Sequence, residues 1–395
     1  MKPNMDGYIF FYNIIAQINS KSNSIDLYSY YGKLNYINKS LNKFHGVDEL
    51  PISHMHSINF ENMKEILERL KKISYIYYQN YLFYFEIVSI YDSRIFKKYG
   101  KYIVDDNLVS TVYIKVRHRN KDINDSVSET LFLDYFCKVD DEVLIKILDE
   151  LVNDLELKIN GDVPIEHDKV IMSEQSASYL IHETIGHLSE SDTQYYNNFI
   201  SRFKNSKFNT NLNIIDFSYK YKNKLLPIAM KYDYELSKCK DVNIILNGEY
   251  NDSYYAKENN KGKESTGNVR MLIPSTKFLL RNRNLILMPH LDINLVKETK
   301  NALFIKRIIG GKVDLDGKFE LLVNSSYSIQ NGELEVACKD FILCGDLIQT
   351  MKRLKIIAGR MELNPLFCNK NGEKLVVTSG SPKLLFEDGF KIKYN

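Results

Sequence analysis

Apolar residues recur at helical spacing in two stretches of the first 160 residues, and alternating runs lie between them. The helical positions are Phe60, Met63, Ile66, Leu67, Leu70 and Ile73, then Val143, Leu144, Ile147, Leu148, Leu151, Val152 and Leu155. Asn59 is a candidate N-cap for the first helix. Leu82–Ile90 is apolar and aromatic, and Leu108–Arg117 alternates, as strands do. This order predicts a mixed α/β domain over residues 1–160.

A different pattern begins after Asn160–Pro164, a run of turn residues that we interpret as a domain linker. A helix is predicted from Ser173 to Leu188, with Ser173 as its N-cap. The following segment, Glu190–Lys224, is polar and rich in Asn, Ser and Tyr. We therefore expect it to form a long irregular excursion.

The rest of the chain consists mostly of short apolar or alternating runs separated by two-residue turn signals. These signals are Asn247-Gly248, Asp316-Gly317, Asn331-Gly332, Asn371-Gly372 and Asp388-Gly389. Such dipeptides favour tight β-hairpins. One more helix is predicted from Asp346 to Ile357. The fold class is therefore predicted to be α+β, with a second domain over residues 161–395 that joins the helix at 173–188 to a mostly antiparallel β-sheet.

Composition narrows the classes of function. The 395 residues include 53 basic and 50 acidic side chains, so a net charge of +3 gives no overall field for nucleic acid or an anionic membrane. Five widely spaced cysteines argue against a disulfide framework and for a reducing compartment. No apolar run is long enough to span a membrane, and no secretory signal is evident. We expect a cytoplasmic protein with no nucleic-acid or membrane partner.

The segment from His182 to His187 (HETIGH) carries the most informative chemistry. Its two histidines are five residues apart, whereas the zinc-peptidase pattern His-Glu-x-x-His places them four apart. At about 100° per residue, five steps turn the side chains ~140° apart, so a regular α-helix cannot direct both rings at one metal. We predict a π-bulge, with Gly186 as its most yielding position. Both imidazoles would then bind zinc, with Glu183 as general base on a water molecule.

A catalytic zinc bound by two histidines needs a third protein ligand. The candidates are Glu190 and Asp192 nearby, and His290 and Cys368 further along the chain. Cys368 stands before a turn and outside an apolar run, a context that suits an accessible thiolate. Alternatively, the histidines lie satisfied on a half-buried helix face and Cys368 is a small buried apolar residue. The residues alone leave both interpretations open.

Five segments resemble, in the same order, elements of the TldD/PmbA family of metallopeptidases. They are Val170–Asp192 with its His-Glu-x-x-Gly-His motif, Ser265–Arg270 (STGNVR), Gly310–Phe319, Tyr327–Gly332 (YSIQNG) and Cys368–Pro382. The resemblance covers about residues 163–392. The first 160 residues match only in the order of helices and strands, and Ser381 replaces the family's Gln.

The resemblance implies a zinc site made by His182, His187 and Cys368, with Glu183 as the catalytic base. It also implies short or unfolded peptides as substrates. The active form that it implies is a homodimer, or a heterodimer with a paralogous subunit, that encloses a cavity around the metal.

An extended peptide is expected to add as a strand beside the C-terminal sheet. Close backbone approach favours glycine, so the substrate-binding candidates are Gly310 and Gly311, and the segment Thr266, Gly267 and Asn268. The alternative is that these glycines serve only turns or bulges.

A second function, from another class, is a non-catalytic peptide-binding subunit with a structural zinc, the partner of an active paralogue. A structural zinc needs a fourth protein ligand, for which Glu190 or Asp192 would serve.

The remaining polar positions are not predicted to act in catalysis or ligand binding. Arg281-Asn282-Arg283 is predicted to be a solvated surface, His290 a core or supporting residue, Cys338 and Cys344 buried thiols, and His45, His54 and His56 residues without a role.

Overall fold

The computed structural model describes residues 5–35, 41–44, 58–98, 101–120, 125–136, 139–192, 196–257, 262–271, 278–314 and 316–394. His45, His54, His56 and Cys137 lie outside these residues. The described chain forms two large sheets, one built before residue 133 and one after residue 168. This arrangement confirms the predicted α+β class.

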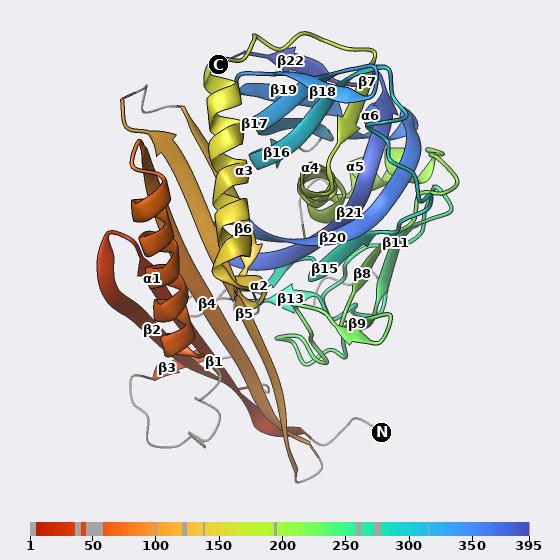
Figure 1. Ribbon diagram of the computed structural model, residues 1–395. Helices are drawn as coiled ribbons and strands as arrows, with labels where there is room; N and C mark the ends of the chain where they lie inside the picture. Colours follow the sequence, from red (N-terminus) through yellow and green to blue (C-terminus); the bar gives the residue numbers. More distant parts are fainter. Residues whose placement is uncertain are drawn as a thin grey trace.

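The first sheet has six antiparallel strands in the order β3-β2-β1-β4-β5-β6. Their bounds are β1 Met5–Asn19, β2 Ser22–Asn35, β3 Leu41–Phe44, β4 Tyr81–Lys98, β5 Lys101–His118 and β6 Ser126–Phe132. Helices α1 (Phe60–Tyr77) and α3 (Asp141–Ile159) pack on one face of this sheet, and the short α2 (Leu133–Phe136) follows β6 (Figure 1).

Both long helices begin where the sequence places a cap. The side chain of Asn59 accepts a hydrogen bond from the backbone N–H of Asn62 at 2.9 Å, and Asp140 does the same for Val143 at 3.1 Å. Such caps satisfy amide groups that the first helical turn leaves unpaired. The predicted apolar stripe of α1 faces the core, where Met63, Ile66, Leu67, Leu70 and Ile73 are buried.

The second sheet has twelve strands and curves around helix α4 (Glu174–Ile181), as Figure 1 shows. Its main order is β12-β11-β8-β15-β21-β7-β16-β17-β19-β22, with β18 on β17 and β20 on β21. The strands are β7 Lys169–Met172, β8 Ile214–Phe217, β11 Val242–Leu246, β12 Glu249–Tyr250, β15 Asn284–Leu287, β16 Asn301–Val313, β17 Lys318–Gln330, β18 Glu333–Ala337, β19 Phe341–Asp346, β20 Leu354–Lys370, β21 Glu373–Glu387 and β22 Lys391–Lys393. Most neighbours are antiparallel, while the pairs β15–β21 and β7–β16 are parallel.

The turn signals are largely confirmed. Asn247-Gly248, Asn331-Gly332 and Asn371-Gly372 close two-residue hairpins with positive φ at both positions, the geometry of type I′ turns. Asp316-Gly317 lies in the β16–β17 hairpin. Asp388-Gly389 does not close a hairpin, because β22 pairs with β19 rather than β21.

Two other expectations need correction. The helix predicted from Asp346 to Ile357 is α6, Leu347–Lys352, because the chain enters β20 at Leu354. The region predicted to be irregular contains α5 (Tyr196–Lys204), β8 and a small hairpin of β9 (Lys220–Tyr221) with β10 (Lys224–Leu225). Another short pair joins β13 (Val269–Arg270) to β14 (Leu279–Leu280). Within the described residues, no helix is both long and apolar enough to cross a membrane.

The segment that follows α3 is held against the second sheet by backbone hydrogen bonds. Asp162 forms a bridge with Cys338, its N–H donates to Ala337 O at 3.0 Å, and its carbonyl accepts from Lys339 at 3.0 Å. A Cβ on Gly161 would lie 2.5 Å from Ala337 O, so the contact requires glycine. Buried polar contacts also join the two sheets, since Ser128 of β6 donates to Asn324 of β17 at 3.1 Å. The division at residue 160 stays a prediction.

Candidate metal centre

The predicted distortion lies where the motif requires it. Ser173 caps α4, and the helix continues from His182 to Gly186 as a π-helical turn. The N–H of His187 bonds to the carbonyl of His182, five residues earlier, as a π-helix requires. The two imidazole centres are 4.9 Å apart. The extra residue is thus absorbed in the backbone, and both rings face the same side.

Cys368 joins the two histidines although it lies 181 residues beyond His187. β20 carries the cysteine, whose Sγ is 3.7 Å from His187 Nε2. One donor atom from each of His182, His187 and Cys368 lies within 4.8 Å of the other two. The cysteine is only 1% exposed, so the expectation of an accessible thiolate is wrong. It lies against Leu366 and Val377, which exclude water from the sulfur.

Each histidine is oriented by a contact on its other ring nitrogen. His182 Nδ1 lies 3.0 Å from Asn282 Oδ1, and His187 Nδ1 lies 3.3 Å from a carboxylate oxygen of Glu190. Both acceptors favour the tautomer that carries hydrogen on Nδ1 and leaves Nε2 with a lone pair toward the cluster. His182 Nε2 is buried and has no hydrogen-bond partner among the described residues. Buried polar atoms of this kind call for a ligand.

Charges around the cluster favour a thiolate. Burial alone raises the pKa of the Cys368 thiol, but the adjacent imidazoles of His182 and His187 outweigh it and lower that pKa to about 5. Burial lowers the pKa of His187, yet the neighbouring Glu190 carboxylate raises it well above its ordinary value. Two imidazoles and one thiolate are the donor types that zinc prefers, so the residues fit that metal.

The other candidate ligands serve different purposes. Lys370 Nζ binds Glu190 and Asp192, each at 2.7 Å, and Asp192 also accepts the N–H of Leu280 at 3.1 Å. Burial raises the pKa of Glu190, but the Lys370 charge lowers it to about 2. His290 is exposed and lies outside the cluster, so its prediction as a core or supporting residue is wrong. Cys338 is buried as predicted, whereas Cys344 is half-buried.

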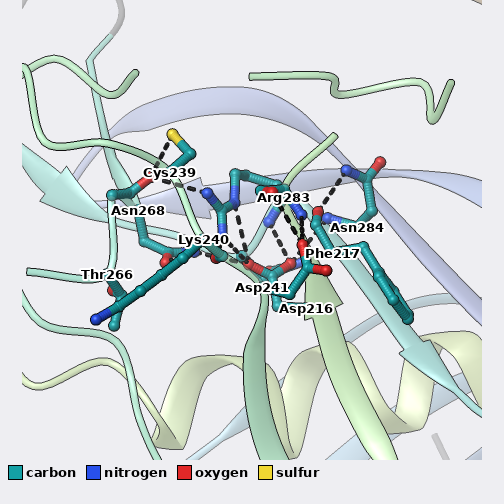
Figure 2. A network of polar contacts seen from close by, with 12 residues as sticks. Asp216, Phe217, Cys239, Lys240, Asp241, Thr266, Asn268, Arg283 and Asn284 are labelled. Atoms are coloured by element: carbon teal, nitrogen blue, oxygen red, sulfur yellow. Dashed lines mark hydrogen bonds and ion pairs between the residues drawn. The ribbon is translucent and has the colours of Figure 1, made fainter. Parts of the chain in front are cut away.

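The predicted solvated surface at Arg281–Arg283 is also wrong, since these three side chains are fully buried. Arg281 Nη1 donates to Cys368 Sγ at 3.0 Å and Asn282 contacts His182, so two of them adjoin the cluster. Arg283 instead binds the buried carboxylate of Asp216 at 3.1 Å (Figure 2). The feature of the sequence that could have indicated this burial is the position of the run, which directly precedes the apolar strand β15.

The substrate-binding candidates fall into two groups. Thr266 and Asn268 lie in the network of Figure 2, where Asn268 donates to Asp216 at 2.7 Å. The carbonyl of Gly267 accepts a hydrogen bond from Arg283 at 3.0 Å. Gly267 has φ +73°, and a Cβ there would lie 2.6 Å from the backbone of Cys239. The structure gives this segment a packing role, and substrate contact there stays a prediction.

Gly311 lies beside the candidate base, whereas Gly310 faces Leu322. A Cβ on Gly311 would come within 3.2 Å of Glu183 Cγ and within 2.6 Å of Leu321 Cδ2. Glu183 is itself half-buried. Burial raises the pKa of its carboxyl group, and the charges of His182 and His187 act in the opposite direction. A carboxylate beside three converging donors is the arrangement that general-base hydrolysis needs.

A family model described as the PmbA/TldA metallopeptidase C-terminal domain matches residues 166–392. The chain belongs to the PmbA/TldD family of metallopeptidases. The matched residues include the π-helical turn and Cys368, so the family assignment and the cluster rest on the same part of the chain.

Relatives in the PmbA/TldD family are similar over much of the chain. A zinc metalloprotease TldD homolog from Saccharolobus solfataricus is 28% identical over 320 residues, 75% of this chain and 69% of that protein. A metalloprotease from Methanocaldococcus jannaschii is 28% identical over 256 residues, 62% of this chain and 55% of its own length. The structure of TldE from Thermococcus kodakarensis superposes with a TM-score of 0.73 at 13% identity, covering 98% of this chain and 96% of that chain. That similarity shows a shared fold.

Proposed function

We propose that this protein is a zinc-dependent peptidase in which His182, His187 and Cys368 hold Zn²⁺ and Glu183 is the general base. The observation that carries the proposal is the convergence of three donor atoms within 4.8 Å through a π-helical turn. A regular helix would turn the two rings apart. The contacts of Asn282 and Glu190 on the outer ring nitrogens support the same assignment.

The bound metal and the residues around the cluster have different roles in the proposed reaction. Bound zinc lowers the pKa of a water molecule and polarises a carbonyl group. In this proposal the Glu183 carboxylate takes up the proton of the attacking water and returns it to the leaving amine. Its half-buried position raises its pKa, which suits a group that must hold a proton between the two transfers.

The peptide would lie along β16. Within the described residues, β7 pairs with β16 only at Leu303–Ile305, while β17 covers its other edge as far as Val313. The stretch from Gly310 to Val313 therefore presents an open strand edge beside Glu183. A peptide added there would gain main-chain hydrogen bonds with little dependence on its sequence, as short or unfolded substrates require.

The proposal extends to assembly and location. Family membership supports a homodimer, or a heterodimer with a paralogous subunit, around an enclosed cavity, and the predicted location is the cytoplasm. A non-catalytic subunit with a structural zinc is less well supported, because it needs a fourth protein ligand. Glu190 and Asp192, the two candidates for that ligand, are both bound to Lys370.

Metal analysis tests the proposal. The purified chain should contain one zinc per subunit and cleave an unstructured peptide, whereas Cys368→Ala should lose both properties. Cys344→Ala is the matched control, because it removes a half-buried thiol outside the cluster. Full zinc content in Cys368→Ala would place the third ligand elsewhere. Zinc without cleavage in the wild-type chain would favour the structural role.

A further inference from the structure

A groove of about 1140 Å³ lies at the end of the first sheet, beside the turn between β1 and β2. Five of its lining residues are basic and seven are aromatic, and none is acidic. The basic residues are Lys21, Lys71, Lys115, Arg117 and Arg119. The carboxylates of Asp149, Glu156 and Glu86 adjoin the groove and accept hydrogen bonds from three of its lining tyrosines, so cations outnumber anions there without excluding them. A surface with an excess of one charge attracts ligands of the opposite sign.

Two of these cations have no partner of their own. Lys71 pairs with Glu68 at 3.3 Å, and Arg119 donates to the carbonyl of Gln79 at 2.7 Å. The side chains of Lys115 and Arg117 make no hydrogen bond or ion pair within the part of the chain that the structure describes, and only their backbone groups pair with neighbouring strands. Being two residues apart on β5, they project from the same face of the sheet. Their charges are thus available to a ligand.

The groove also offers an open strand edge. β1 pairs with β4 only as far as Asn19 opposite Glu86, and Ser20 then exchanges two hydrogen bonds with the backbone of Phe85. By the alternation of an antiparallel strand, the backbone N–H and C=O of Phe83 face the same side. They have no partner there among the described residues. A free backbone pair beside cations recognises a peptide rather than a nucleic acid.

We propose that this groove binds an acidic, aromatic-containing segment of a peptide. This proposal rests on the proposed peptidase function. A second cavity lies between the groove and the helix that carries the candidate base. That cavity, of about 120 Å³, shares Tyr113 with the groove and is also lined by Tyr179, one helical turn before Glu183. The remainder of a substrate held in the groove by its acidic end would extend past Tyr113 toward the helix that carries Tyr179.

A binding measurement tests this apart from catalysis. The probe is a fluorescein-labelled twelve-residue peptide rich in Glu and Phe, added to Glu183→Gln so that nothing is cleaved. Fluorescence anisotropy should show saturable binding that weakens with salt. The double variant Lys115→Ala/Arg117→Ala should raise Kd about tenfold. Lys146→Ala, on the exposed face of α3, should leave Kd unchanged.

Three outcomes would overturn the proposal. One is an unchanged Kd in the double variant, and another is an equal loss in Lys146→Ala. The third is tighter binding of labelled oligo(dT) than of the peptide, which would assign the groove to single-stranded nucleic acid. If the groove were instead an interface between two copies of the chain, light scattering would show the double variant to be monomeric with unchanged peptide binding. That result would also overturn the proposal.

A separate observation concerns Arg281. Its side chain is fully buried, and Nη1 donates to both the carbonyl oxygen and the sulfur of Cys368, each at 3.0 Å. Nη2 donates to the carbonyls of Lys370 and Glu373 at 3.3 and 3.0 Å. Within the described residues no carboxylate binds this guanidinium, and the Cys368 sulfur is the side-chain acceptor that it contacts there.

We infer that Arg281 is a positioning residue that fixes the Cys368 sulfur and withdraws electron density from it. A thiolate ligand donates more charge to zinc than a neutral ligand does, and a cation on the sulfur reduces that donation. Zinc would then stay a stronger Lewis acid while keeping its sulfur ligand. Arg281 contacts neither substrate nor metal in this role.

Arg281→Met tests the inference through the metal rather than through turnover. A chelator competition should show zinc affinity reduced about 10–100-fold. In the Co²⁺-substituted protein, the sulfur-to-cobalt charge-transfer band should move to lower energy, because the sulfur becomes easier to oxidise. Arg281→Lys, which keeps the charge, should recover most of both properties. If the Met variant does not fold, Arg281→Gln replaces it, since its amide still reaches the strand carbonyls.

A folded Met or Gln variant with wild-type zinc affinity and an unmoved band would overturn the inference. So would a Lys variant that behaves like the Met variant in both measurements, because the role would then be one of shape rather than charge. A merely structural role would lower thermal stability without moving the band.

Discussion

Arg281 and Arg283 are two residues apart and both fully buried, but they contact different kinds of group. Arg283 forms an ion pair with Asp216, whose carboxylate also accepts the N–H groups of Arg283 and Asn284 at 2.8 and 2.9 Å (Figure 2). Arg281 contacts the sulfur of Cys368 instead. One short segment thus holds the fold together on one side and contacts the His182–His187–Cys368 cluster on the other.

This difference shows that burial alone does not separate packing from function. An ion pair such as Asp216–Arg283 satisfies both of its charges within the network. At the cluster, by contrast, His182 Nε2 remains unsatisfied among the described residues, and Arg281 has a thiol as its partner. This unsatisfied ring nitrogen lies on the side of the segment where we propose that a metal binds. Substitutions on the two sides should therefore affect different measurements.

The largest expected effect is on cleavage. Glu183→Gln removes the base while keeping the size of the side chain, so peptide cleavage should fall by about 10²–10⁴-fold. Zinc content and the free energy of unfolding should stay the same, because neither depends on that carboxylate. Kinetic assays with metal analysis check both statements. Undiminished cleavage would remove Glu183 from the reaction.

On the packing side, Arg283→Met should lower the free energy of unfolding by about 3–5 kcal/mol, because the Asp216 charge stays buried without its cation. Urea denaturation measures this loss. The double variant Asp216→Asn/Arg283→Met should recover part of it, since no charge is then left unpaired. A loss below about 1 kcal/mol in the single variant would contradict the role given to the ion pair.

Removing the metal should lower the stability of the folded chain through the cluster of His182, His187 and Cys368. Zinc at a free concentration of 100 Kd would stabilise the folded chain by about 2.7 kcal/mol. A chelator should therefore lower the unfolding midpoint of the wild-type chain and leave that of Cys368→Ala almost unchanged. An equal shift in both proteins would show that the chelator acts elsewhere.

The smallest effect should come from Asn282→Ala. Losing the acceptor on His182 Nδ1 should weaken zinc binding by about 10–100-fold, with a minor change in stability. Asn284→Ala is the matched control, because Asn284 bonds the backbone of Phe217 and Ile228 instead. The control should lose stability and keep its zinc affinity. The reverse result would remove the distinction between the two sides.

Local features of this molecule could be predicted from the sequence. Asn59 and Ser173 cap helices as expected, since capping depends on neighbouring residues. The π-helical turn followed from the spacing of two histidines and the geometry of a helix. The choice of Cys368 as the third ligand came from the resemblance to a family, because no local rule links it to a helix 181 residues away.

The predictions of side-chain exposure that were wrong concern residues whose burial depends on contacts with distant segments. The run Arg281–Arg283 was predicted to be solvated because charged residues are mostly exposed. Its burial is set by Asp216, 67 residues before Arg283, and by Cys368, 87 residues after Arg281. The sequence of the run contains neither partner. For the same reason Cys368 was expected to be accessible, although Leu366, Val377 and Tyr179 pack around it.

The extra residue in the π-helical turn is taken up within the turn itself. Four steps of a regular helix turn about 400°, so a chain with one residue fewer between His182 and His187 would also present both rings on one side. The bulge over His182–Gly186 thus brings a five-residue spacing to the ligand geometry that the common zinc motif reaches with four. Because the surplus is confined to this turn, Leu188–Asp192 continues in the direction that brings Glu190 and Asp192 to Lys370.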